Sequence, residues 1–101
     1  MTAPGASSWR DMLEEFTPEL FKSMNGLRET IMAEGALSTK GKTLIMMLGD
    51  ALLGHSDRVD NIARRARELG VSQEKIAETL GVSFMMGGMH SLITGSGVFL
   101  N

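Results

Sequence analysis

The sequence predicts an all-α protein, and three observations support this. Strand-forming aromatic residues are scarce, because the chain has four Phe, one Trp and no Tyr, whereas Leu, Met and Ala supply most of the apolar content. Apolar residues recur at helical spacing in several segments. Ser or Thr residues precede these segments and glycines follow them, as helix caps do. With 101 residues in all, residues 1–8 are expected to form a flexible N-terminal arm and residues 9–101 a single helical domain.

In the N-terminal part of this domain, the sequence predicts two helices. Ser8 is placed to cap a short helix over residues 9–16. Thr17 is placed to cap a second helix with Pro18 at its first position. Gly35 is expected to end that helix. Its apolar residues at helical spacing are Leu20, Met24, Leu27 and Ile31.

Residues 38–70 predict a helical hairpin at the centre of the fold. Ser38 is placed to cap its first helix and Gly54 to end it. This helix is apolar around most of its circumference, as a central core helix is. Its apolar residues are Leu44, Ile45, Met46, Met47, Leu48, Ala51 and Leu52. Ser56 is placed to cap the second helix and Gly70 to end it. The inward face of that helix carries Val59, Ile62, Ala63 and Ala66, and the outward face Arg58, Arg64, Arg65, Arg67 and Glu68.

The last helix is expected to begin at Ser72 and to be buried. Residues 79–101 contain no Asp, Glu, Lys or Arg, and only His90 is of a type that titrates near neutral pH. The same stretch contains five glycines, three serines and two threonines, so we interpret it as a buried helix and not as a membrane span. A domain this small cannot cover the whole helix, which indicates an oligomer. Gly87 and Gly88 are expected either to kink the helix or to admit a close neighbour.

Composition excludes several classes of function. The formal net charge of -2 shows no basic excess that would indicate nucleic-acid binding. The chain has no cysteine, which excludes disulfides, thiolate nucleophiles, Cys-ligated zinc and thiol peroxidase chemistry and fits a cytoplasmic protein. The N-terminal sequence lacks the basic and apolar regions of a secretory signal. No resident cofactor is expected.

The segment GHSDRVDNI, between the two central helices, holds the first candidate site. In one interpretation Arg58 binds a substrate carboxylate in a bidentate pair, His55 transfers a proton, and Asp57 orients that histidine. In the other, these residues form a helix cap, an exposed histidine and a solvated charge run. Asp50, within the preceding apolar helix, is expected to pair with an arginine of the next helix.

The segment MMGGMH holds the second candidate site. On a continuous helix Met86, Met89 and His90 lie at positions i, i+3 and i+4, and two thioethers with an imidazole are ligands for Cu(I). The alternative is that the methionines fill core space beside the glycines. His90 is expected to be either a buried histidine with a satisfied hydrogen bond or a residue that lines a cavity between subunits.

Three segments resemble the carboxymuconolactone decarboxylase and alkylhydroperoxidase-D superfamily. They are LSTKGKTLIMM, the helix in which Ala66 precedes Gly70 by four residues, and GVSQEKIAETLGVSFMMGG. The family commonly reads Leu-x-x-Lys-x-x-x-Leu-Ile, then Ala-x-x-x-Gly-x-x-x-x-Glu-Ile-x-Glu, and later Gly-Gly. Lys75 replaces the first Glu of this pattern, and Glu78 retains the second. The resemblance covers roughly residues 18–95, most of the chain.

The resemblance implies an alkylhydroperoxidase-D-like helical bundle that assembles as a homotrimer or a hexamer. Peroxidase members use a Glu, a Cys-x-x-Cys pair and a His at the positions that Thr43, His55, Arg58 and Ile62 occupy here. Their thiol chemistry is therefore not expected. The decarboxylase branch lacks the cysteine pair and often has a polar turn with a glycine, which Gly54 and His55 resemble. That branch often keeps a histidine where Ile62 stands.

Three functions are consistent with this resemblance and with the candidate sites. The first is a thiol-independent enzyme that acts on a small carboxylate or lactone through His55, Arg58 and His90. The second is a non-catalytic family member that binds a small ligand or a partner. The third is Cu(I) binding by the Met and His residues of the last helix.

Overall fold

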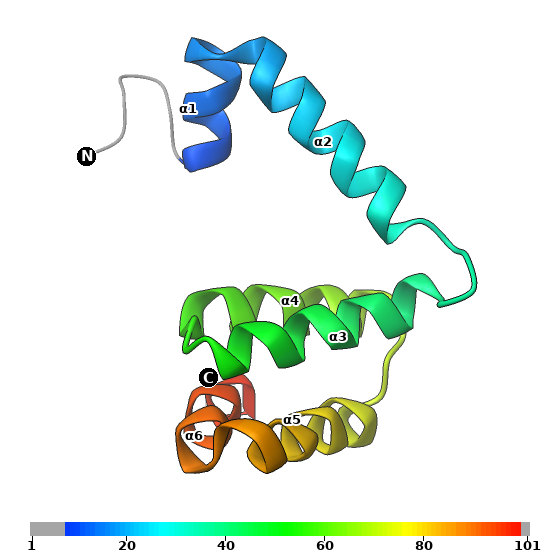
Figure 1. Ribbon diagram of the computed structural model, residues 1–101, viewed down its shortest axis with the longest axis vertical. Helices are drawn as coiled ribbons and strands as arrows, with labels where there is room; N and C mark the ends of the chain where they lie inside the picture. The colour runs from blue at the N-terminus through cyan, green and yellow to red at the C-terminus, as the bar shows by residue number, and fades with distance from the viewer. Residues whose placement is uncertain (1–7, 100–101) are drawn as a thin grey trace. The chain divides into compact units, whose positions relative to one another are not determined.

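The computed structural model describes residues 8–99, so the predicted arm lies outside the described residues except for Ser8. The described part contains six α-helices and one 3-10 helix, and no residue in it is a strand, which confirms the all-α prediction. Figure 1 shows their order along the chain. The elements are α1 (Trp9–Phe16), α2 (Pro18–Met32), α3 (Thr39–Leu52), α4 (Ser56–Glu68), α5 (Gln73–Gly87), α6 (Met89–Ser96) and η1 (Gly97–Phe99).

The chain divides into two compact units, Met1–Ala33 and Glu34–Asn101. The first unit contains α1 and α2, and neither helix has a buried residue. The second unit contains the other four α-helices and the hydrophobic core. The assignment of residues 9–101 to a single domain stays a prediction.

The two helices of the first unit begin where the sequence predicts. The side chain of Ser8 accepts a hydrogen bond from a backbone N–H of the first turn of α1, at 3.3 Å. Thr17 occupies the cap position of α2 as predicted, but its hydroxyl donates to the carbonyl of Leu13 at 3.1 Å and makes no side-chain cap hydrogen bond. α2 ends at Met32, earlier than the expected stop at Gly35, because the next residue has an extended backbone with φ -62° and ψ 154°.

In the second unit, α3 and α4 form the predicted central hairpin, and they lie side by side in Figure 1. Ser38 caps α3 by accepting a hydrogen bond from a backbone N–H of its first turn at 2.9 Å. α3 ends before Gly54, which has a φ of 76° that glycine adopts without steric cost. The predicted cap of α4 at Ser56 is wrong. His55 occupies the cap position because its carbonyl accepts the first hydrogen bond of the helix.

The hydrophobic core lies among α3, α4, α5, α6 and η1. Its buried residues are Met47, Ala51, Val59, Ala63, Ala66, Val71, Ile76, Leu80 and Val98. The inward face predicted for α4 is confirmed at its three buried positions, whereas Ile62 is only partly buried. Burial of each large aliphatic side chain contributes about 1.5–3 kcal/mol, so this small core holds the second unit together.

The predicted last helix is two helices in the structure. It begins as expected, because Ser72 caps α5 by accepting a hydrogen bond at 3.2 Å. Gly88 then adopts φ 68° and ψ -158°, which ends α5 and begins α6. The glycine pair therefore breaks the helix and does not merely kink it.

The single chain leaves part of this segment exposed, as expected for a domain too small to cover it, and its burial in an oligomer stays a prediction. Large apolar side chains of α5 and α6 are exposed, with Met85 at 82%. The others are Val82, Phe84, Met86, Met89 and Ile93. The reason is that α3 and α4 cover only one face of these helices. None of the helices within residues 8–99 has the length and apolar character needed to cross a membrane.

Gly95 of α6 offers a test of the core packing. A β-carbon there would lie 2.5 Å from Cδ2 of Leu80, which is only 2% exposed, so the packed side chain would have to shift. We expect Gly95→Ala to lower the free energy of unfolding by about 1–3 kcal/mol, measured by urea denaturation. The matched control is Gly49→Ala in α3, where a β-carbon meets nothing within 4 Å. The free energy of unfolding of this variant is expected to rise by about 0.5–1 kcal/mol. Equal free energies of unfolding for the two variants would contradict the close packing of Gly95 on Leu80.

Candidate functional site

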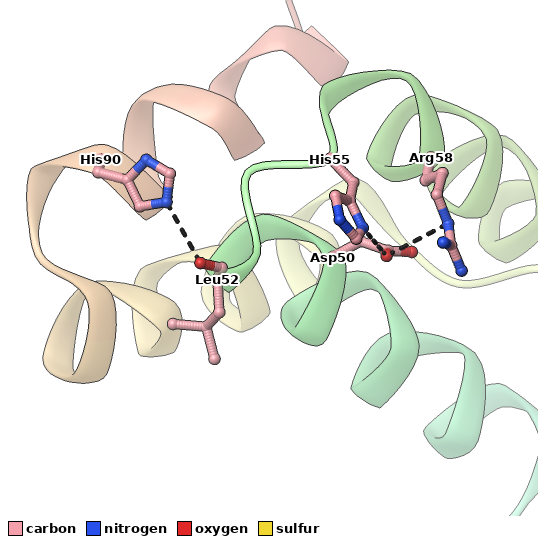
Figure 2. Close-up of polar contacts among 5 residues, drawn as sticks. All are labelled: Asp50, Leu52, His55, Arg58 and His90. Atoms are coloured by element: carbon pink, nitrogen blue, oxygen red, sulfur yellow. Dashed lines mark hydrogen bonds and ion pairs between the residues drawn. The ribbon is translucent and has the colours of Figure 1, made fainter.

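The turn between α3 and α4 brings the first candidate residues together. Two backbone hydrogen bonds close the turn, from Gly54 to the carbonyl of Ala51 at 3.2 Å and from His55 to the carbonyl of Asp50 at 2.9 Å. The second bond folds the chain back over the last turn of α3. His55 therefore lies against Asp50, as Figure 2 shows.

Asp50 is the centre of a polar cluster with His55 and Arg58. Its side chain is 7% exposed, whereas that of His55 is 41% exposed and that of Arg58 is 66% exposed. His55 Nδ1 lies 3.0 Å from Asp50 Oδ1, and Arg58 Nε lies 3.5 Å from the same oxygen. The buried carboxylate thus has a hydrogen-bond donor and a cation beside it, which offset the cost of removing its charge from water.

The contact with Asp50 defines which nitrogen of His55 is available for chemistry. An ionised carboxylate only accepts hydrogen bonds, so we assign the proton in this contact to Nδ1. In the neutral imidazole Nε2 is then the basic nitrogen. Because the ring is only partly buried, Nε2 can exchange a proton with a ligand at the surface of the turn.

Arg58 supplies the positive charge of the cluster. Only its Nε takes part in an ion pair within residues 8–99. The two terminal nitrogens of the exposed guanidinium are therefore not used by Asp50 and can form a bidentate pair with a carboxylate. An imidazole and a guanidinium thus lie beside one buried acid.

The pair between Asp50 and Arg58 confirms the predicted pairing of this acid with an arginine of the next helix. The orienting role predicted for Asp57 needs a correction, because Asp50 and not Asp57 contacts His55. Asp57 lies in the first turn of α4, where an acidic side chain interacts favourably with the helix dipole. The signal that could have identified the orienting acid was a single carboxylate in an apolar helix, five residues before the histidine.

His90 does not join this cluster. Its Nε2 lies 3.2 Å from the carbonyl oxygen of Leu52, so the ring donates a hydrogen bond to the end of α3. Figure 2 shows the ring directed toward Leu52 and away from His55. Of the two alternatives for His90, the buried histidine is wrong, because the residue is exposed on the first turn of α6, although its hydrogen bond is present. A place in a cavity between subunits stays a prediction.

The proposed Cu(I) ligands do not share a helix. The break at Gly88 leaves Met86 in α5 and places Met89 and His90 in α6. The i, i+3, i+4 arrangement from which copper binding was predicted is therefore not formed. Within residues 8–99, no group of three or more His, Cys, Asp or Glu side chains could hold a metal ion.

The remaining positions of the peroxidase pattern have structural roles. Thr43 is buried in α3, and its hydroxyl donates to the carbonyl of Thr39 at 2.8 Å. Ile62 packs against the core from α4. With no cysteine in the chain, the site offers an imidazole, a carboxylate and a guanidinium in place of thiols.

The cluster predicts a larger stability loss for Asp50→Asn than for Asp57→Asn. Neutralising Asp50 leaves Arg58 without its ion pair and weakens the bond with His55, and we expect a loss of about 1–3 kcal/mol. Asp57→Asn removes only an exposed charge near the helix dipole, at a cost of about 0.3–1 kcal/mol. Urea denaturation of both variants at neutral pH checks this. A cluster that contributes nothing to stability would give Asp50→Asn a loss no larger than that of the control.

Comparison with known proteins identifies the family. The model of the carboxymuconolactone decarboxylase family matches residues 18–99, which is well over half of the chain. No curated protein and no solved structure matches the chain. The match covers every helix from α2 to α6 and includes the cluster of Asp50, His55 and Arg58. The chain therefore belongs to the carboxymuconolactone decarboxylase family.

Proposed function

We propose that this family member is a thiol-independent enzyme that acts on a small carboxylate or lactone at the cluster of Asp50, His55 and Arg58. The observation that carries the proposal is the 3.0 Å contact between His55 Nδ1 and Asp50 Oδ1. A buried carboxylate on one ring nitrogen holds an imidazole in one tautomer and directs the other nitrogen to the reacting group. His55 Nε2 is then the general acid or base.

Arg58 determines the class of substrate in this proposal. Its ion pair with Asp50 keeps the guanidinium beside His55, while its exposed terminal N–H groups are free to donate to a planar anion. A substrate carboxylate bound there lies beside the imidazole that transfers a proton to or from the neighbouring carbon or lactone oxygen. Asp50 orients both groups and does not need to contact the substrate.

Turnover of carboxylated lactones tests the proposal. We expect His55→Ala to lower kcat/KM by about 10²–10⁴-fold, since it removes the general acid or base. Arg58→Ala is expected to act mainly on KM, because Arg58 binds the carboxylate before and during the reaction. The matched control is Arg65→Ala, an exposed arginine of the same helix whose nearest acid is Glu68 at 3.6 Å. Its kinetics should equal those of the unmodified protein.

The same assay separates catalysis from binding. If His55→Ala turns over the substrate as fast as the folded parent protein, His55 has no role in catalysis. If small carboxylates raise the melting temperature in an Arg58-dependent manner and no lactone is converted, the protein is a non-catalytic binding member of the family. The arginine has the same role in both functions, and only the histidine distinguishes them.

We also propose that the protein is a homotrimer or a hexamer. The support is the exposed apolar surface of α5 and α6, in a stretch where residues 79–99 carry no Asp, Glu, Lys or Arg. An uncharged surface of this kind matches a second copy of itself without placing like charges in contact.

Lysine substitutions on this surface test the assembly. We expect Met85→Lys combined with Ile93→Lys to shift the mass found by native mass spectrometry from the oligomer to the monomer, since each adds a charge to an apolar contact. Leu27→Lys, at an exposed apolar position of α2, is the control and should leave the mass unchanged if α5 and α6 form the interface. A monomeric parent protein at micromolar concentration would contradict the proposal.

A further inference from the structure

The structure points to His90 as a positioning residue. We propose that its hydrogen bond to Leu52 holds the α3–α4 turn in the conformation that places His55 against Asp50. This proposal rests on the proposed function only for its effect on activity, because its effect on the tautomer of His55 can be measured without a substrate.

The first observation concerns the carbonyl of Leu52. The last carbonyls of a helix have no partner within the helix. The N–H groups of the turn donate elsewhere, that of Gly54 to Ala51 and that of His55 to Asp50. His90 Nε2 reaches the Leu52 oxygen from α6 at 3.2 Å, so a side chain 38 residues away caps the end of α3.

The second observation concerns the residue directly before His55. Gly54 has a φ of 76°, and a β-carbon at this position would lie 3.0 Å from Cε1 of His90. The imidazole of His90 therefore lies against the backbone of the turn and restricts it by contact as well as by its hydrogen bond. A glycine is needed there both for its backbone conformation and for the approach of the ring.

The third observation shows that His90 is itself held in place. A β-carbon at Gly87 would lie 2.7 Å from Cδ2 of Leu52, so the break between α5 and α6 packs directly on the end of α3. Ser91, which follows His90, is fully buried. The backbone on both sides of His90 is thus fixed relative to Leu52, and the ring can transmit this restraint to the turn.

This geometry distinguishes positioning from proton transfer. Nε2 of the imidazole donates in this bond, because a carbonyl oxygen only accepts. Any side chain that donates from the same place should replace the histidine, whereas a general acid or base could not be replaced by an amide.

The variants His90→Gln and His90→Ala test the proposal. Nitrogen-15 NMR of the imidazole reports which nitrogen of His55 carries the proton. We expect the Nδ1-protonated signature in the parent protein and in His90→Gln, whose amide can donate to Leu52. In His90→Ala we expect an averaged signature of both tautomers, because the turn is released. Lys75→Ala, at an exposed position of α5 outside the apolar surface, is the control and should leave the signature unchanged.

The NMR signature of His55 tests the proposal without an assay of substrate conversion. An unchanged signature in folded His90→Ala overturns the proposal. If that variant does not fold, His90→Leu, which retains volume and lacks a donor, takes its place with the same criterion. If a lactone is converted, kcat should fall about 10²-fold in His90→Ala and stay near the parent value in His90→Gln, as for a misplaced catalytic group. An equal loss of kcat in His90→Ala and His90→Gln, with an unchanged NMR signature of His55, would make His90 a catalytic residue. That result would overturn the positioning role.

Discussion

The burial of the Asp50 carboxylate is the constraint on which the candidate site depends. A buried carboxylate that is 7% exposed needs donors, and its two partners follow it in the chain, His55 in the turn and Arg58 in α4. The tight turn through Gly54 brings them back over α3. The requirement to satisfy one buried charge thus produces a partly exposed imidazole in a defined tautomer, with a guanidinium beside it.

Two glycine breaks connect this cluster to the rest of the second unit. Gly54 ends the helix that carries Asp50, and Gly88 separates α5 from α6. The second break brings His90 to the end of α3, where it bonds to the carbonyl of Leu52. The turn is therefore held from both sides, by Asp50 within the hairpin and by His90 from α6. Figure 2 shows both contacts.

The candidate site differs in its residues from the peroxidase pattern that the sequence resembles. In the peroxidase members that the sequence resembles, two cysteines stand at the positions of His55 and Arg58. Here the same positions carry an imidazole and a guanidinium, and the buried acid beneath them serves both. In the proposed function, Asp50 orients the imidazole and the guanidinium, whereas a thiol pair would need a proton relay.

The sequence by itself determined the features that depend on local interactions. The all-α class, the central hairpin and the caps at Ser8, Ser38 and Ser72 follow from helical periodicity and from side chains that bond to nearby N–H groups. It also predicted the pairing of Asp50 with an arginine, because a lone acid in an apolar helix needs a partner. Only the tertiary structure decided that Asp50 orients His55 and that His90 caps α3. Both contacts depend on backbone conformations at Gly54 and Gly88, and the relative placement of α3 and α6 is fixed by packing and leaves no local pattern in the sequence.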